Sequence, residues 1–320
     1  MLKNLYPVLL LILMFNVSCV ENIIFIQVFP DGQTYLKIIS VGDSTDIHDN
    51  DFEHPLKNRL TGNNTFNLIK RDSLWKATTD IIYKDSIFDF YPRNGLGFNI
   101  QRSKKKTTFS TLHNFKMEFI GRVIKENYPL LYNALKDNML DSLEWLPEAM
   151  TVIINQSLID LENETKENKN KINRARLVNH FKNSFARITT FEELEYIQNN
   201  RLDFIKTTIK PFRLSEKFAI KLAEKMKMHE NHLKTSLGLK DDSFVVKLLM
   251  PGELFSANAL SMNQDTLLWK FGLDSLLNDN YILNASSVIY SKKKIQKTSI
   301  LIMCFLLIFG IILINKQKKL

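Results

Sequence analysis

Runs of apolar residues and short polar turns follow one another along the first part of the chain. Residues 23–29 are rich in β-branched and aromatic side chains, and Pro30-Asp31-Gly32 then forms a turn signal. A second run of the same kind occupies residues 34–39. Two such runs around a short turn predict a β-hairpin. Further strands are predicted around residues 66–70, 75–83 and 97–102.

The pattern becomes helical from about residue 114 to residue 237. Apolar residues recur there at spacings of three and four positions, as in Phe115, Phe119 and Val123. Such spacing predicts amphipathic helices with one apolar face. If these faces lie over a curved sheet, they enclose a lipid-sized groove; otherwise they form ordinary core. Thr190 and Glu193 have the spacing of a helix capping box.

Strand patterns return after the helical stretch. Predicted strands occupy residues 244–250, 253–260, 266–271 and 281–290. Strand-rich ends around a helical middle predict an α+β fold, in which a mostly antiparallel sheet built from both chain ends carries a helical insertion. The predicted divisions are a β-rich part at residues 20–112, the helical insertion at 113–238 and a second β-rich part at 239–291.

The N-terminus has the features of an export signal. Lys3 precedes an apolar run at residues 5–15, and Ser18 and Cys19 follow it. The run is too short to cross a ~30 Å hydrocarbon core comfortably, but it has the length of the apolar part of a secretory signal. Residues 1–19 are therefore predicted to be a signal peptide. Three fates remain open: lipidation of Cys19, ordinary cleavage nearby, or an uncleaved anchor.

An apolar stretch near the C-terminus predicts a transmembrane helix at residues 298–315. Lysines stand on both sides of this stretch, so the positive-inside rule does not orient it. If the N-terminal signal starts translocation, the body lies outside the cytoplasm and residues 316–320 form a cytoplasmic basic tail. The predicted location is therefore a membrane, with the body extracytoplasmic.

Charge and cysteine content agree with an envelope protein. The formal net charge is +9, but most of the excess comes from lysines near the two ends, so the body is close to neutral. This distribution argues against a nucleic-acid partner. Cys19 and Cys304 are the only cysteines. The body between them therefore has neither a disulfide framework nor a cysteine-based metal site.

Short motifs at the two ends of the chain occur in a definite order. A signal ending at Cys19 leads directly into a strand, the Pro30-Asp31-Gly32 turn and a second strand. Near the other end come Pro251-Gly252, Asn258 and Trp269, and a last strand with Ala285-Ser286 precedes the apolar stretch. This arrangement resembles LppM-type bacterial surface lipoproteins, although the long helical middle departs from the family pattern. The resemblance implies an envelope protein that handles lipid or glycolipid, and it implies no reaction.

Residues 46–54 form the densest group of carboxylates and imidazoles in the chain. His48, Asp49, Asp51 and His54 have the chemistry of ligands for a divalent metal. An exposed polar loop has the same composition, because a metal site also needs an ordered frame that makes its ligands converge. We therefore assign these residues as candidates only, and the sequence predicts no cofactor.

The sequence contains no Gly-x-Ser-x-Gly elbow, no phosphate-binding lysine loop and no Cys-x-x-Cys pair. No catalytic residue is therefore assigned. The leading hypothesis is a non-catalytic, membrane-anchored envelope protein that binds a partner protein or a lipid-like amphiphile near the membrane surface. The alternatives are an envelope hydrolase or transferase whose site is assembled from distant residues, and a structural subunit of a membrane complex.

Overall fold

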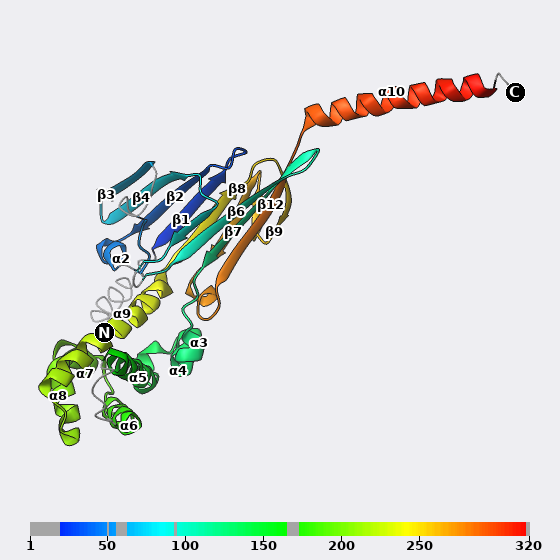
Figure 1. Cartoon of the computed structure of the whole chain (residues 1–320). Helices are drawn as coiled ribbons and strands as arrows, with labels where there is room; N and C mark the ends of the chain where they lie inside the picture. The colour runs from blue at the N-terminus through cyan, green and yellow to red at the C-terminus, as the bar shows by residue number, and fades with distance from the viewer. Residues whose placement is uncertain (1–19, 50, 56–62, 93–94, 165–172, 318–320) are drawn as a thin grey trace, which may run out of the picture.

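The computed structural model describes residues 20–49, 51–55, 63–92, 95–164 and 173–317. The predicted signal peptide at residues 1–19 lies outside the described residues, and so does Cys19. The described chain is α+β, with two mostly antiparallel sheets, a body of helices and one long C-terminal helix (Figure 1). The expectation of a single sheet is therefore wrong.

The larger sheet has seven strands, in the order β10-β11-β8-β1-β2-β4-β3. Their bounds, in that order, are Ser261–Asn263, Thr266–Phe271, Ser243–Leu249, Glu21–Val28, Thr34–Gly42, Leu74–Tyr83 and Asn63–Arg71. β1 and β2 form the predicted hairpin, with Ile24 paired to Ile38. The pair of β1 and β8 is parallel, and it joins the two ends of the body in one sheet.

The smaller sheet has five strands, in the order β5-β6-β7-β12-β9. Their bounds, in that order, are Ile87–Phe90, Phe98–Lys106, Ser110–Phe119, Tyr281–Tyr290 and Glu253–Ala257. The sequence analysis placed residues 113–119 in the helical insertion, but this prediction is wrong because they belong to strand β7. Phe115 and Phe119 are buried in this strand, so they belong to the core and line no groove beneath a helix.

Aromatic rings from both sheets meet in the core between them. Phe119 of β7 lies 4.9 Å from Phe271 of β11 and 6.2 Å from Phe244 of β8, measured between ring centroids. Tyr83 of β4 and Phe88 of β5 are 4.9 Å apart. Buried aromatic pairs at these distances contribute both area and favourable ring geometry. They therefore join the two sheets into one core.

Asn258 links the two sheets at one edge. Its side-chain oxygen accepts hydrogen bonds from Trp269 Nε1 at 3.1 Å and from the backbone amide of Asn284 at 2.8 Å. Its side-chain amide donates to the carbonyl of Ile282 at 2.8 Å. Trp269 belongs to β11 of the larger sheet, and the other two partners belong to β12 of the smaller sheet. The motif that carried the family resemblance therefore has a structural role.

The helical body lies at one end of the sheets (Figure 1). Its α-helices are α3 (Ile124–Asn127), α4 (Pro129–Lys136), α5 (Leu146–Glu164), α6 (Arg174–Phe185), α7 (Phe191–Asn199), α8 (Arg201–Ile209) and α9 (Glu216–Gly238). Asn173, Thr190 and Ser215 cap α6, α7 and α9 through their side chains. The capping box of Thr190 and Glu193 is confirmed, with both of its hydrogen bonds present.

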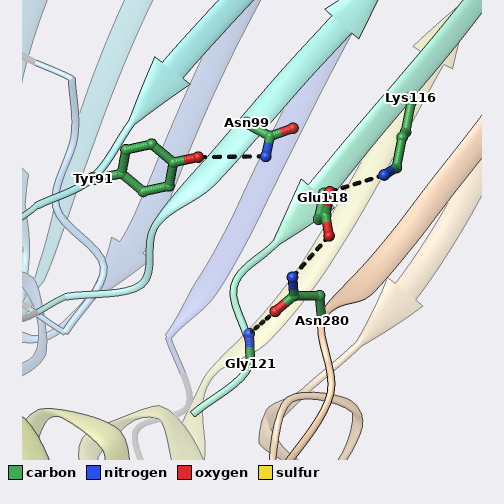
Figure 2. Close-up of polar contacts among 6 residues, drawn as sticks. All are labelled: Tyr91, Asn99, Lys116, Glu118, Gly121 and Asn280. Carbon is green, nitrogen blue, oxygen red and sulfur yellow. Dashed lines mark hydrogen bonds and ion pairs between the residues drawn. The ribbon is translucent and has the colours of Figure 1, made fainter. Parts of the chain in front are cut away.

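A set of polar contacts holds the chain where it leaves β7 for the helical body (Figure 2). The amide of Gly121 donates to Asn280 Oδ1 at 2.8 Å, and Asn280 Nδ2 donates to Glu118 Oε1 at 2.7 Å. Lys116 pairs with the other Glu118 oxygen at 2.9 Å. Hydrogen bonds from Asn280 and Lys116 lower the pKa of Glu118. Figure 2 shows the side chain of Asn280 between Gly121 and Glu118, so it ties the end of β7 to the segment before β12.

Arg122 anchors the same joint to the last helix of the body. Its buried guanidinium donates to Ser236 Oγ at 2.8 Å and to the carbonyl of His232 at 3.2 Å, both in α9. It also donates to the carbonyl of Gly95 at 3.2 Å. Burial lowers the pKa of Arg122 to about 10. One side chain therefore joins α9, the loop before β6 and the joint after β7.

Helix α10 (Lys292–Gln317) extends away from both sheets (Figure 1). The expectation of a transmembrane helix at residues 298–315 is wrong, because no helix in the described part of the chain is long and apolar enough to cross a bilayer. Four of the first six residues of α10 are lysines, so the apolar part is shorter than the helix itself. A spanning helix needs about 20 apolar residues.

The α2 helix (Ser44–His48) lies beside β2 and β4 at the start of the segment with the candidate metal ligands. This short helix and residues 51–55 pack over the ends of the larger sheet near α9, where the backbone amide of Leu96 donates to the carbonyl of Asp51 at 2.7 Å. The segment with the candidate metal ligands is therefore ordered by contacts with neighbouring elements.

Candidate functional site: a cavity in the helical body

The helical body encloses a cavity of about 500 Å³. One wall comes from the start of α5, where Leu146, Met150 and Ile153 follow a helical spacing that turns all three inward. α9 forms the facing wall. The remaining apolar lining residues are Leu140, Trp145, Ala149, Phe185, Leu194, Ile197, Phe204, Met226, Leu233 and Leu237. The volume lies in the range of pockets that hold small organic ligands.

The outer wall of the cavity is α7. Leu194 and Ile197 of this helix line the cavity but are only half-buried, and no described residue of α7 is fully buried. The helix is held at its first turn by the capping box of Thr190 and Glu193. A helix with so little buried surface opens at low free-energy cost. α7 is therefore the least deeply packed wall of the cavity.

Polar side chains gather on one side of the cavity. Arg201 of α8 and Glu230 of α9 form an ion pair, with exposed side-chain fractions of 18% and 9%. Burial raises the pKa of Glu230, although Arg201 and Lys234 act in the opposite direction. Lys234 donates to Gln198 of α7 at 3.0 Å. The cavity therefore has an apolar wall from α5 and a polar edge from α7, α8 and α9.

The cavity lining does not contain the side chains of an acyl-transfer triad. Among the described residues around the cavity there is no histidine, serine, threonine or cysteine. The site thus offers no hydroxyl or thiol nucleophile beside an imidazole base, which acyl transfer by a triad requires. An apolar chamber with a few polar groups along one edge is the arrangement that holds an elongated ligand with one polar end.

The structure does not bring the four candidate metal ligands together. His48 is exposed at the end of α2, where its Nδ1 lies 2.8 Å from the carbonyl of Ser44. Asp49 is exposed, whereas Asp51 is buried. His54 lies between two hydroxyl groups, 2.9 Å from Ser40 Oγ and 2.8 Å from Thr79 Oγ1. Across the described ranges, no three His, Cys, Asp or Glu side chains converge on a point that could hold a metal ion.

Asp51 and His54 belong instead to a buried polar cluster at the ends of the central strands of the larger sheet. Asn22 donates to Asp242 at 2.9 Å, and Ser40 donates to Asn22 and lies beside His54. Burial, together with the nearby carboxylates of Asp242 and Asp49, raises the pKa of Asp51 to about 9. The cluster joins β1, β2, residues 51–54 and the start of β8, so its contacts support a structural role.

The pKa shifts in this region predict how stability depends on pH. The pKa of Asp51 is about 9 in the folded state, against an ordinary value of 3.8, so this carboxyl keeps its proton up to about pH 9. Burial lowers the pKa of His54 and His232 to about 4 from 6.5. The unfolded chain thus binds more protons than the folded chain between about pH 4 and 6.5, and fewer above that range. Stability is therefore expected to peak near pH 6.5.

Replacing Asp51 with asparagine tests the alkaline side of this profile. Above pH 6.5 the wild-type chain is expected to lose up to ~1.4 kcal/mol of unfolding free energy per pH unit, the value for one proton. The Asp51→Asn variant should lose almost none, because a carboxamide does not titrate. Urea unfolding at several pH values measures both slopes. Asp89→Asn, at an exposed position, is the control and should retain the wild-type slope.

The sequence missed the cavity because its residues come from separate helices. Leu146, Leu194, Ile197 and Leu233 lie in apolar stripes, but a stripe does not tell whether the space in front of it is filled. Arg201 and Glu230 are far apart in the sequence, so no local pattern indicates that they pair.

Comparison with known proteins gives little further guidance. No protein-family model matches the chain, and no curated protein does. Among solved structures, the chain is similar to the folded domain of LppM from Mycobacterium tuberculosis, determined by NMR. The TM-score is 0.28 and the identity 6%, over 87% of this chain and 94% of that one. This is the family that the chain ends resemble, but a score this low does not establish a shared fold.

Proposed function

We propose that this chain is a non-catalytic protein of the cell envelope whose helical body binds the alkyl chain of an amphiphile. The observation that carries the proposal is the cavity of about 500 Å³, with its apolar wall from α5 and its polar edge from α7, α8 and α9. The location in the envelope rests on the predicted signal peptide at residues 1–19.

The chemistry of the lining supports an amphiphile over a fully polar ligand. Each methylene group transferred from water into an apolar site contributes about 0.8 kcal/mol. An alkyl chain along Met150 and Ile153 gains that energy repeatedly, which offsets the entropic cost of binding. The polar edge carries both charge signs, with Arg201 beside Glu230 and Lys234 near Glu195. It therefore favours a head group that forms hydrogen bonds over one with a strong net charge.

A cavity-filling substitution tests the proposal. Met150 is buried and lines the cavity, and tryptophan at this position would occupy the space of about two ligand methylene groups. The Met150→Trp variant is therefore expected to bind the uncharged probe Nile red about tenfold more weakly than the wild-type chain. Fluorescence titration measures the affinity, and displacement by a monoacylglycerol confirms that the probe occupies an alkyl site.

Met228 provides the matched control. It lies on α9, is 46% exposed and is not part of the lining. Met228→Trp adds the same indole to the same helical body, so it should retain wild-type affinity for the probe. Equal affinities of the Met150→Trp variant and the wild-type chain, with both chains folded by circular dichroism, would contradict binding in the cavity.

A further inference from the structure

The tip of the β6–β7 hairpin lies against the start of α10. Ser110 of β7 pairs with Tyr290 of β12, which is the last residue of its strand. The amide of Ser291 donates to the carbonyl of Phe109 at 2.7 Å. The first turn of α10 therefore begins at the hairpin tip, as Figure 1 also shows for the two segments.

This meeting point concentrates positive charge. The surface formed there, called the basic tip below, contains the lysines Lys104, Lys105, Lys106, Lys292, Lys293, Lys294 and Lys297. All seven are exposed, and none of them forms a salt bridge with another described residue. Residues 103–113 and 286–299 include no Asp or Glu. These lysines supply most of the net charge of +9.

Apolar side chains stand among the lysines. Phe109 is 40% exposed, Tyr290 53% and Ile295 42%. A bilayer surface has two layers with different chemistry. Apolar side chains can enter the boundary between head groups and acyl chains, while neighbouring lysines remain at the phosphates. A nucleic acid offers the same phosphates but no apolar layer for these three side chains.

We propose that the basic tip docks on the surface of an anionic lipid bilayer. The attraction is electrostatic and peripheral: the lysines approach the phosphate groups, and Phe109, Tyr290 and Ile295 enter the head-group boundary. The distribution of charge sets the orientation, because the remainder of the chain is close to neutral. The inference is independent of the cavity, which lies in the helical body at the other end of the sheets (Figure 1).

Vesicle sedimentation with the full chain tests this inference. Binding should be strong to vesicles of phosphatidylcholine mixed with phosphatidylglycerol at low salt, and it should fall steeply as salt screens the charges. Replacing Lys104, Lys105 and Lys106 together with glutamine should weaken the partition to these vesicles by about a hundredfold, since each lysine near an anionic surface contributes a factor of about five. These residues lie outside α10, so the comparison isolates the charge of the hairpin.

A matched triple variant controls for net charge. Lys136, Lys182 and Lys217 are exposed on the helical body, and their joint replacement with glutamine changes the net charge equally but should leave vesicle binding as it is. Three results would overturn the inference: equal losses for the two triple variants, equal binding to vesicles of phosphatidylcholine alone, or tighter binding to a double-stranded oligonucleotide than to the anionic vesicles. Circular dichroism establishes that each variant is folded.

Discussion

Replacing Arg201 with methionine is expected to lower the free energy of unfolding by about 3 to 5 kcal/mol, the range observed when one partner of a buried ion pair is removed. Arg201 and Glu230 have exposed side-chain fractions of only 18% and 9%. Without the guanidinium, the carboxylate of Glu230 has lost its ion-pair partner in a mostly apolar setting. Burial already raises the pKa of Glu230, so the variant should shift it further upward. Urea unfolding at neutral pH measures the loss.

A double variant distinguishes the effect of an unpaired charge from the effect of lost packing. Replacing both Arg201 and Glu230 with methionine removes both charges, so most of the lost stability should return. It also removes two charged groups from the polar edge of the cavity while Lys234 remains, which should leave Nile red binding intact or tighter. A double variant no more stable than Arg201→Met would show that the loss comes from packing and not from the uncompensated charge.

Replacing Gly121 with alanine is the second substitution for which we expect a large effect, a loss of about 3 kcal/mol or more. A Cβ atom at this position would stand 2.4 Å from the carbonyl oxygen of Asn278 and 2.6 Å from the backbone of Asp279. Both obstacles are backbone, which cannot rotate away. The loop before β12 would have to move, and the hydrogen bond from Gly121 to Asn280 would be strained (Figure 2). Thermal or urea unfolding measures the loss.

Gly310 provides the control for this substitution. A Cβ atom there meets nothing within 4 Å, and alanine has the higher helix propensity. Gly310→Ala should therefore leave the unfolding free energy of the body unchanged. If Gly121→Ala were as stable as this control, the joint between β7 and the helical body would be looser than the structure indicates.

Local patterns were enough to predict the individual strands and caps. Ile24 and Ile26 belong to a run of β-branched and aromatic residues, which favours a strand, and Pro30-Asp31-Gly32 sets the turn between β1 and β2. The spacing of Thr190 and Glu193 was enough to predict a capped helix. These features depend on residues a few positions apart, and such short-range physics can be read directly from a sequence.

Strand β7 shows where local patterns are ambiguous. Phe115 and Phe119 are four residues apart, a spacing that serves one face of a helix and equally one face of a strand. Met117, between Lys116 and Glu118, decides for the strand: it is buried with both phenylalanines, at a period of two. The helical interpretation gave too little weight to that central residue.

The cavity lay beyond any local pattern. Met150 and Ile153 lie on one apolar face of α5. Whether side chains of other helices fill the space in front of this face depends on how α5 packs against α7, α8 and α9. The Arg201–Glu230 pair likewise joins two helices that only the tertiary fold brings together. The positions of the candidate metal ligands also depend on the tertiary fold: His48 and His54 are near neighbours in sequence, but they contact different partners, Ser44 in one case and Ser40 with Thr79 in the other.

A chain-length series of monoacylglycerols, titrated calorimetrically below their aggregation concentrations, tests the central claim most directly. If the cavity holds the alkyl chain, affinity should rise about fourfold per added methylene group until the cavity is full, and then level off. The Met150→Trp variant should level off at a shorter chain, and Met228→Trp should follow the wild-type curve. The absence of binding, or curves that rise identically for the wild-type chain and Met150→Trp, would contradict the account.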